Sequence, residues 1–201
     1  MKKVLLSILM VGMTFSMCAC GNDKQPNNYS DKNEVKLETY KKFDDLTMTR
    51  MLGSFDDVWV DFPSWRENGS ETCTVAEHLN YYIIGVISKE DYSFDELFNN
   101  VAKSDLKHFV NRGTYENFIP EKTEEITFSN GIKATKFEGT LSLEDYGDVY
   151  NYPTYGYYFK FNNYPIMIMS VETDSNDNSE EERLITNNYV DKMIETIRKA
   201  S

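Results

Sequence analysis

The strongest constraint on the fold is a series of apolar runs joined by short turns. Residues 124–129 and 132–143 flank Asn130 and Gly131, and residues 155–161 and 165–171 flank a second short polar turn. Asn-Gly is a preferred dipeptide of two-residue hairpins, and strands joined by such turns pair antiparallel. Further strands are predicted at residues 57–62 and 80–88, with weaker ones at 46–52 and 71–76.

Two one-sided helices are predicted between the strand groups. Ser93 with Glu96 and Ser179 with Glu182 have the spacing of a capping box, which satisfies free amides at a helix start. Apolar residues follow each box at three-and-four spacing. After Ser93 they are Phe94, Leu97, Phe98, Val101, Ala102, Leu106, Phe109 and Val110, and the helix is predicted to end at Gly113. After Ser179 they are Ile185, Tyr189, Val190, Met193, Ile194 and Ile197. Helices between groups of antiparallel strands predict the α+β class.

The N-terminus has the layout of a secretory signal. Lys2 and Lys3 precede the apolar residues 4–15, which are too few to span a bilayer because a spanning helix needs roughly 20 apolar residues. Small residues then lead to Cys20, so the segment resembles a bacterial lipoprotein signal in which Cys20 receives diacylglycerol. Ala19 and Gly21 fit this pattern, whereas Met17 and Cys18 depart from it. An ordinary signal peptide with incidental cysteines is the alternative.

Composition divides the chain into three parts. We expect a lipoprotein signal peptide at residues 1–19, a flexible polar tether at 20–36 and one globular domain at 37–201. Residues 1–19 hold two lysines and no acid, so their removal changes the net charge from −12 to −14. Such an acidic surface repels nucleic acid and anionic lipid headgroups. We therefore expect no nucleic-acid partner and contact with the membrane only through the N-terminal lipid.

The order of elements resembles the PsbP-like fold, which the photosystem II extrinsic subunit shares with several bacterial lipoproteins. The resemblance covers most of residues 55–199. It depends on the run from Phe62 to Trp65, the Ser93 box, residues 131–140, the final hairpin and the C-terminal helix with Ile194 and Ile197. It implies an antiparallel β-sheet with helices packed on both faces, an α/β/α sandwich. The fold hosts unrelated roles, so it does not deliver a function by itself.

Residues 145–158 hold six tyrosines and form the best candidate binding surface. Tyrosine combines an apolar ring with a polar tip, which suits sugar or protein contacts. Strand alternation places Tyr155 and Tyr157 on one sheet face and Tyr158 on the other. We expect Tyr146, Tyr150 and Tyr152 to lie exposed in a loop before the strand, and assign Tyr146, Tyr150, Tyr152 and Tyr155 as candidate ligand or partner contacts. The alternative is that the strand tyrosines are core.

Other candidate sites have weaker patterns. Cys73 would be the only cysteine left beside Cys20, which favours a small buried residue over a nucleophile. His78 lies near two glutamates in the sequence without a zinc spacing, and His108 is expected to be solvated. Residues 174–180 alternate oxygen-bearing side chains, but the calcium-loop glycine and final acid are missing, so a polar turn is favoured. We predict no catalytic residue, metal or cofactor.

The sequence therefore predicts a non-enzymatic domain, lipid-anchored on the extracytoplasmic face of the cell membrane, that binds or assists another envelope protein. The alternative is a lipoprotein that binds a small ligand or glycan through the tyrosine-rich segment.

Overall fold

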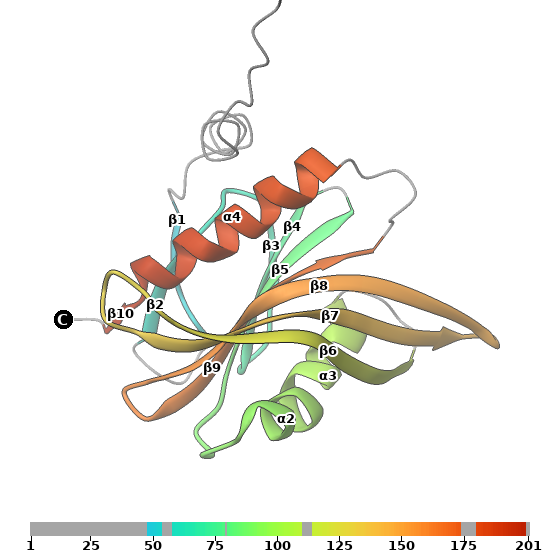
Figure 1. Ribbon diagram of the computed structural model, residues 1–201, viewed down its shortest axis with the longest axis horizontal. Coiled ribbons are helices and arrows are strands. Elements are labelled where there is room, and N and C mark those ends of the chain that lie inside the picture. Colours follow the sequence, from blue (N-terminus) through green and yellow to red (C-terminus); the bar gives the residue numbers. More distant parts are fainter. Residues whose placement is uncertain (1–47, 54–57, 79, 110–113, 174–179, 200–201) are drawn as a thin grey trace, which may run out of the picture. The chain divides into compact units, whose positions relative to one another are not determined.

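The computed structural model describes residues 48–53, 58–78, 80–109, 114–173 and 180–199 (Figure 1). The predicted signal peptide, Cys20 and the tether lie outside these residues, as do residues 174–179 of the predicted polar turn. Within them the fold is mainly β, with two antiparallel sheets and few helices.

The larger sheet has seven strands in the order β3-β4-β5-β9-β8-β7-β6. Every neighbouring pair is antiparallel, as the short turns predict. Its strands are β3 (Arg66–Gly69), β4 (Cys73–His78), β5 (Tyr81–Ile87), β6 (Thr114–Thr127), β7 (Lys133–Asp145), β8 (Asp148–Phe161) and β9 (Tyr164–Glu172). Asn130 and Gly131 lie in the turn between β6 and β7, as predicted, but the turn is longer than two residues: the Phe128 N–H donates to the Ile132 carbonyl at 2.9 Å, and Gly131 has a positive φ of 86°.

The smaller sheet pairs β2 (Val58–Phe62) with β1 (Met48–Met51) on one side and β10 (Arg198–Lys199) on the other. It packs onto β5 at Gly85, where a Cβ atom would come within 2.3 Å of Leu52 Cδ1 and 3.1 Å of Phe62 Cζ. A glycine at this position therefore lets the two sheets approach closely.

The helices are α2 (Phe94–Leu97), the π-helical turn η1 (Phe98–Ala102), α3 (Lys103–Phe109) and α4 (Glu180–Thr196). Alternate residues of the large sheet belong to two separate apolar clusters. Ile83 and Ile168 cluster with α4 residues such as Tyr189, while Ile84 and Met169 cluster with residues of α2, η1 and α3.

The structure corrects several element boundaries. The predicted middle helix is present, but a π-helical turn interrupts it, and Val110 to Gly113 lie outside the described residues. Strand β6 begins ten residues earlier than the predicted residue 124, because an edge strand tolerates Pro120 at a register shift. Strand β8 begins at Asp148, within the segment predicted as a loop. The short strands β3 and β10 were not predicted, since four and two residues carry little pattern.

Candidate functional site

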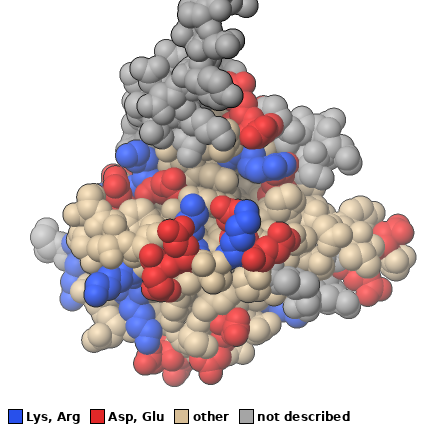
Figure 2. Space-filling view, viewed as in Figure 1, with Lys and Arg blue, Asp and Glu red and all other residues tan. Residues whose placement is uncertain are grey.

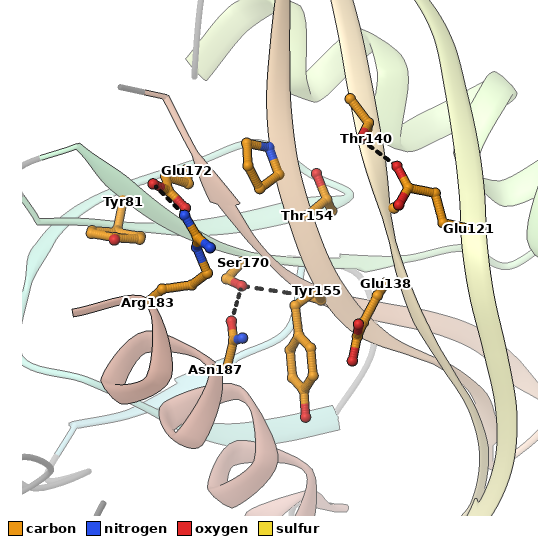
Figure 3. Close-up of a pocket in the computed structure, with 12 residues that line it drawn as sticks. Tyr81, Glu121, Glu138, Thr140, Thr154, Tyr155, Ser170, Glu172, Arg183 and Asn187 are labelled. Carbon is orange, nitrogen blue, oxygen red and sulfur yellow. Dashed lines mark hydrogen bonds and ion pairs between the residues drawn. The ribbon is translucent and has the colours of Figure 1, made fainter. Parts of the chain in front are cut away.

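A cavity of about 310 Å³ opens between helix α4 and the strands of the large sheet (Figure 3). Its lining is mostly polar, and five strands and α4 contribute to it. The lining residues are Tyr81, Glu121, Glu138, Gly139, Thr140, Pro153, Thr154, Tyr155, Ser170, Glu172, Arg183 and Asn187. This volume lies at the lower end of the range for small-molecule sites.

Strand register brings part of this lining together. Tyr81 of β5 lies opposite Glu172 of β9, and Ser170 of β9 lies opposite Tyr155 of β8. Tyr155 in turn lies opposite Glu138 of β7. Because cross-strand partners project from the same sheet face, polar residues far apart in the sequence form a continuous surface there.

An irregularity in β6 adds Glu121 to the same surface. The register with β7 shifts between Pro120 and Lys122, so Glu121 is the extra residue of a bulge. A bulge can re-aim a side chain that regular alternation would send to the other face. Here Glu121 Oε1 accepts a hydrogen bond from the Thr140 hydroxyl at 2.7 Å, and Lys122 Nζ donates to Glu138 Oε2 at 3.0 Å.

Helix α4 supplies the opposite wall. Arg183 and Asn187 lie four residues apart and so on one helix face. Arg183 holds the carboxylate of Glu172 through two nitrogens, with Nε to Oε2 at 2.7 Å and Nη2 to Oε1 at 3.3 Å. Glu172 is only 3% exposed, and hydrogen bonding to it raises the pKa of Arg183. The Ser170 hydroxyl lies 2.9 Å from Asn187 Oδ1.

Tyr81 contributes an unsatisfied polar atom to the cavity lining. Its side chain is 97% buried, and within the described residues its hydroxyl has no hydrogen-bond partner. Burial, and secondarily the negative charge of Glu172, raise the pKa of Tyr81, so the hydroxyl keeps its proton. A buried hydroxyl without a partner loses the hydrogen bonds that water would supply, which favours occupation of the site by a hydrogen-bonding group.

Hydrogen bonds from Tyr155 and Tyr157 connect the sheet to α4. The Tyr157 hydroxyl donates to Asp191 of α4 at 2.8 Å, the Tyr155 hydroxyl also donates to Asp191, and the two hydroxyl oxygens are 2.9 Å apart. Burial and then the Asp191 charge raise the pKa of both tyrosines, so both remain donors. Their predicted common face is confirmed, because both belong to the cluster under α4, whereas Tyr158 packs against the other cluster.

The tyrosine-rich segment is a hairpin, and its tyrosines divide into two groups. Tyr146 is fully exposed and Tyr150 is 45% exposed, as predicted. Tyr152 is only 7% exposed and belongs to the cluster with α2 and η1, so its predicted exposure is wrong. Tyr155 is also buried, and of the four candidate contacts it alone lines the cavity. The alternation of β8, which begins earlier than predicted, turns Tyr152 inward.

The tip of this hairpin has exposed apolar side chains beside acidic ones. Tyr146 and Gly147 form a two-residue turn with φ of 51° and 90°, and Val149 behind it is 65% exposed. Glu144 and Asp148, both exposed, flank the turn. Figure 2 shows acidic side chains at this end of the molecule, and Lys and Arg side chains mixed with acids across the middle of the same face.

Near the tip, one edge of β8 has no partner strand among the described residues. Strand β8 pairs with β9 only from Thr154 onward, so among the described strands Asp148 to Pro153 pair with β7 alone. Hydrogen-bonding directions alternate along an antiparallel strand, so the backbone groups of Val149 and Asn151 point away from β7. An open strand edge can accept a strand from another protein.

The structure also shows the surroundings of Cys73, His78 and His108, the other residues considered as sites. Cys73 is 1% exposed, and burial raises the pKa of its thiol well above the usual value, which suits a core residue and not a nucleophile. His78 stacks on Trp65, with ring centroids 5.1 Å apart, and His108 is exposed on α3. Within the described residues no group of three His, Cys, Asp or Glu is placed to hold a metal, and no described helix is long and apolar enough to cross a membrane.

Sequence reasoning missed the cavity residues of β9 and α4. The available signal was the polar pair Ser170 and Glu172, two residues apart at the end of an otherwise apolar strand. Alternation sends both side chains to one face, where a charged residue is costly unless it is paired.

No protein-family model matches the chain, and no curated protein matches it. Similar solved structures include one from Bacteroides thetaiotaomicron at 1.50 Å resolution, which is 12% identical with a TM-score of 0.38, over 75% of this chain and 50% of that chain. A protein of unknown function from Pseudomonas aeruginosa, PA94, is 10% identical with a TM-score of 0.32, over 59% of this chain and 78% of that one. The chain thus spans half the length of the Bacteroides protein, and neither likeness is close enough to indicate a function.

Proposed function

We propose that this chain is a lipid-anchored extracytoplasmic domain without enzymatic activity, which binds another protein of the cell envelope through the tip of the β7–β8 hairpin. The tip is defined by Tyr146, Val149 and Tyr150. The lipid anchor at Cys20 and the location on the extracytoplasmic face rest on the N-terminal sequence pattern.

The observation that carries the proposal is the backbone of Tyr146. It has a φ of 51°, which is an outlier for a bulky residue, yet its side chain is fully exposed and gains no packing in the fold. Asn or Gly would satisfy the same turn with less strain. Strain held at an exposed aromatic residue is explained if the ring is used for binding, because aromatic side chains dominate binding hot spots.

The surroundings of the tip specify the partner. Val149 and Tyr150 are consecutive in β8 and add exposed apolar surface on opposite faces of the hairpin, so the partner needs an apolar recess that receives the tip between its walls. Glu144 and Asp148 require Lys or Arg around that recess. The edge of β8 at Val149 and Asn151, which no described strand covers, offers backbone pairing to an extended segment of the partner.

We also propose the PsbP-like α/β/α arrangement as the fold. Support comes from the antiparallel strand order and from the two apolar clusters, since α4 contributes to one and α2, η1 and α3 to the other.

Small-ligand binding is the second candidate function. The unsatisfied, buried Tyr81 hydroxyl favours it, and it places the ligand in the cavity under α4 and not at the exposed tyrosines.

Site-specific photo-cross-linking tests the leading proposal. A photoreactive phenylalanine analogue replaces Tyr146 in the intact envelope, and the matched control replaces Asn163, which is exposed in the next hairpin turn. We expect one discrete protein adduct at position 146, absent at 163 and weakened by high salt because the contact is partly electrostatic. Absence of an adduct, or the same adducts at both positions, would argue against the tip as the binding surface.

A further inference from the structure

The buried polar lining of the cavity under α4 is typical of a binding site and not of a packing defect. Tyr81, 97% buried, leaves its hydroxyl without a partner among the described residues, and Glu172 is buried to the same extent beneath Arg183. Buried polar groups normally have hydrogen-bond partners. A cavity lined by a buried hydroxyl without one therefore favours a polar ligand.

Donors and acceptors lie on opposite walls (Figure 3). On α4, Arg183 uses Nε and Nη2 for Glu172, which leaves the N–H groups of Nη1 for another acceptor, and the Asn187 amide nitrogen has no hydrogen bond within the described residues. On β6 and β7, the carboxylates of Glu121 and Glu138 each keep lone pairs beyond their bonds to Thr140 and Lys122.

Two of the three carboxylates in the lining form ion pairs. Glu172 is paired with Arg183, and Glu138 with Lys122, whose pKa the nearby Glu121 also raises. The lining has more carboxylates than cations, which disfavours an anionic ligand, and a cationic group could not accept a hydrogen bond from Arg183 on the opposite wall. A neutral ligand that both donates and accepts can bond to both walls.

We infer that the cavity binds a neutral, polyhydroxylated small molecule of about the size of one sugar ring. Each hydroxyl of such a ligand donates and accepts, so it can accept from Arg183 and Asn187 and donate to Glu121 and Glu138 at the same time. Pro153 and the ring of Tyr155 supply apolar surface for its C–H groups. This inference specifies the ligand class for the second candidate function, and it is independent of the leading proposal because the cavity and the hairpin tip share no residue.

Titration of purified full-length protein in detergent tests the inference. The neutral probes are glucose and myo-inositol, the anionic probe is gluconate and the cationic probe is putrescine, with binding followed by ligand-observed NMR. We expect at least one neutral probe to bind with a dissociation constant below about 10 mM and gluconate and putrescine to bind about tenfold more weakly. Failure of both neutral probes to bind, or tighter binding of either charged probe, overturns the inference.

Two variants on one strand locate the binding. Glu121 and Glu125 of β6 are both exposed and each accepts from a threonine hydroxyl of β7, at 2.7 Å from Thr140 and 2.5 Å from Thr135, but only Glu121 lines the cavity. Glu121→Ala should weaken binding of the neutral probe about tenfold, because a hydrogen bond to a charged group is lost. Glu125→Ala should leave it unchanged. Equal effects of the two variants would contradict the assignment.

A third variant separates this inference from the proposed function. Tyr146→Asn changes the hairpin tip and should leave binding of the neutral probe unchanged. Loss of probe binding in Tyr146→Asn would place the ligand at the tip and not in the cavity.

Discussion

Tyr146 and Asn162 hold the first position of two successive two-residue hairpin turns, and both have a φ of 51°. Asn is one of the few residues that adopt this conformation readily, whereas an aromatic residue in it is strained. The second position follows the same rule, with Gly147 in one turn and Asn163 in the other. The chain thus has favourable turn residues at the β8–β9 hairpin and an unfavourable one, Tyr146, at the β7–β8 hairpin.

Tyr146→Asn should therefore stabilise the fold. The substitution relieves strain at a fully exposed position, and the expected gain in the free energy of unfolding is about 0.5–1 kcal/mol. Denaturant unfolding of the wild type and the variant measures it. The reciprocal change Asn162→Tyr should destabilise by a similar amount, and a loss of stability in Tyr146→Asn would show that the ring supports the fold.

Tyr152 and Tyr150 should respond differently to truncation, although they lie two residues apart. Tyr152→Ala removes a buried ring from the cluster with α2 and η1, with an expected loss of about 3 kcal/mol. Tyr150→Ala changes a half-exposed side chain and should alter stability by only about 0.5 kcal/mol. Thermal melts of the two single variants compare them directly. Similar melting points would contradict the burial of the Tyr152 ring.

The buried carboxyl of Asp105 should make stability fall as pH rises through the acid range. Burial raises the pKa of Asp105, and this effect is only partly offset by hydrogen bonds from the Ser70 and Thr72 hydroxyls, both 3.0 Å long. A raised pKa means that the folded state holds the proton to higher pH than the unfolded state, so ionisation destabilises the fold.

Asp105→Asn removes this titration. As pH rises above the ordinary carboxyl pKa of about 3.9, the variant should gain stability relative to the wild type. Unfolding free energies measured across this range test the prediction. In Ser70→Ala, stability should keep falling to higher pH than in the wild type, because one of the hydrogen bonds that lower the Asp105 pKa is lost. Parallel pH profiles for Asp105→Asn and the wild type would exclude a raised pKa.

Cys20→Ala should release the protein from the membrane fraction, since the modified cysteine is the expected anchor. Fractionation with an N-terminal sequence of the mature chain measures both location and processing. A processed wild-type chain that begins at another residue, without lipid, would refute the assignment of Cys20.

The sequence predicted local pairings well because hairpin chemistry is local. Asn130 and Gly131 place the β6–β7 turn, and the apolar run of β9 is present as predicted. Pro153 and the polar residues around it led to the prediction of a loop at the start of β8. In the structure this part of β8 pairs with β7 only, which explains why proline and polar residues are tolerated there.

The cavity could not be predicted in the same way. Its lining depends on the register of five strands and on a bulge at Glu121, and neither is encoded in a short window of sequence. The long-range partners Glu172 and Arg183 meet only because α4 follows β9 and returns across the sheet (Figure 1). Buried polar residues such as Ser170 and Glu172 were the local sign of a site whose position needed the fold.

The most direct test of the central claim is quantitative co-purification from the intact envelope. Wild type, Tyr146→Asn and the control Asn163→Gly are compared at equal amounts of anchored protein, with melting points measured on the same samples. We predict one envelope protein that is recovered with the wild type and the control and reduced about tenfold or more with Tyr146→Asn, because loss of an aromatic hot spot weakens binding by roughly 2 kcal/mol. The melting point of Tyr146→Asn should be higher than that of the wild type, because the strain at the turn is relieved. Equal recovery of that protein with all three chains would contradict a binding role for the hairpin tip.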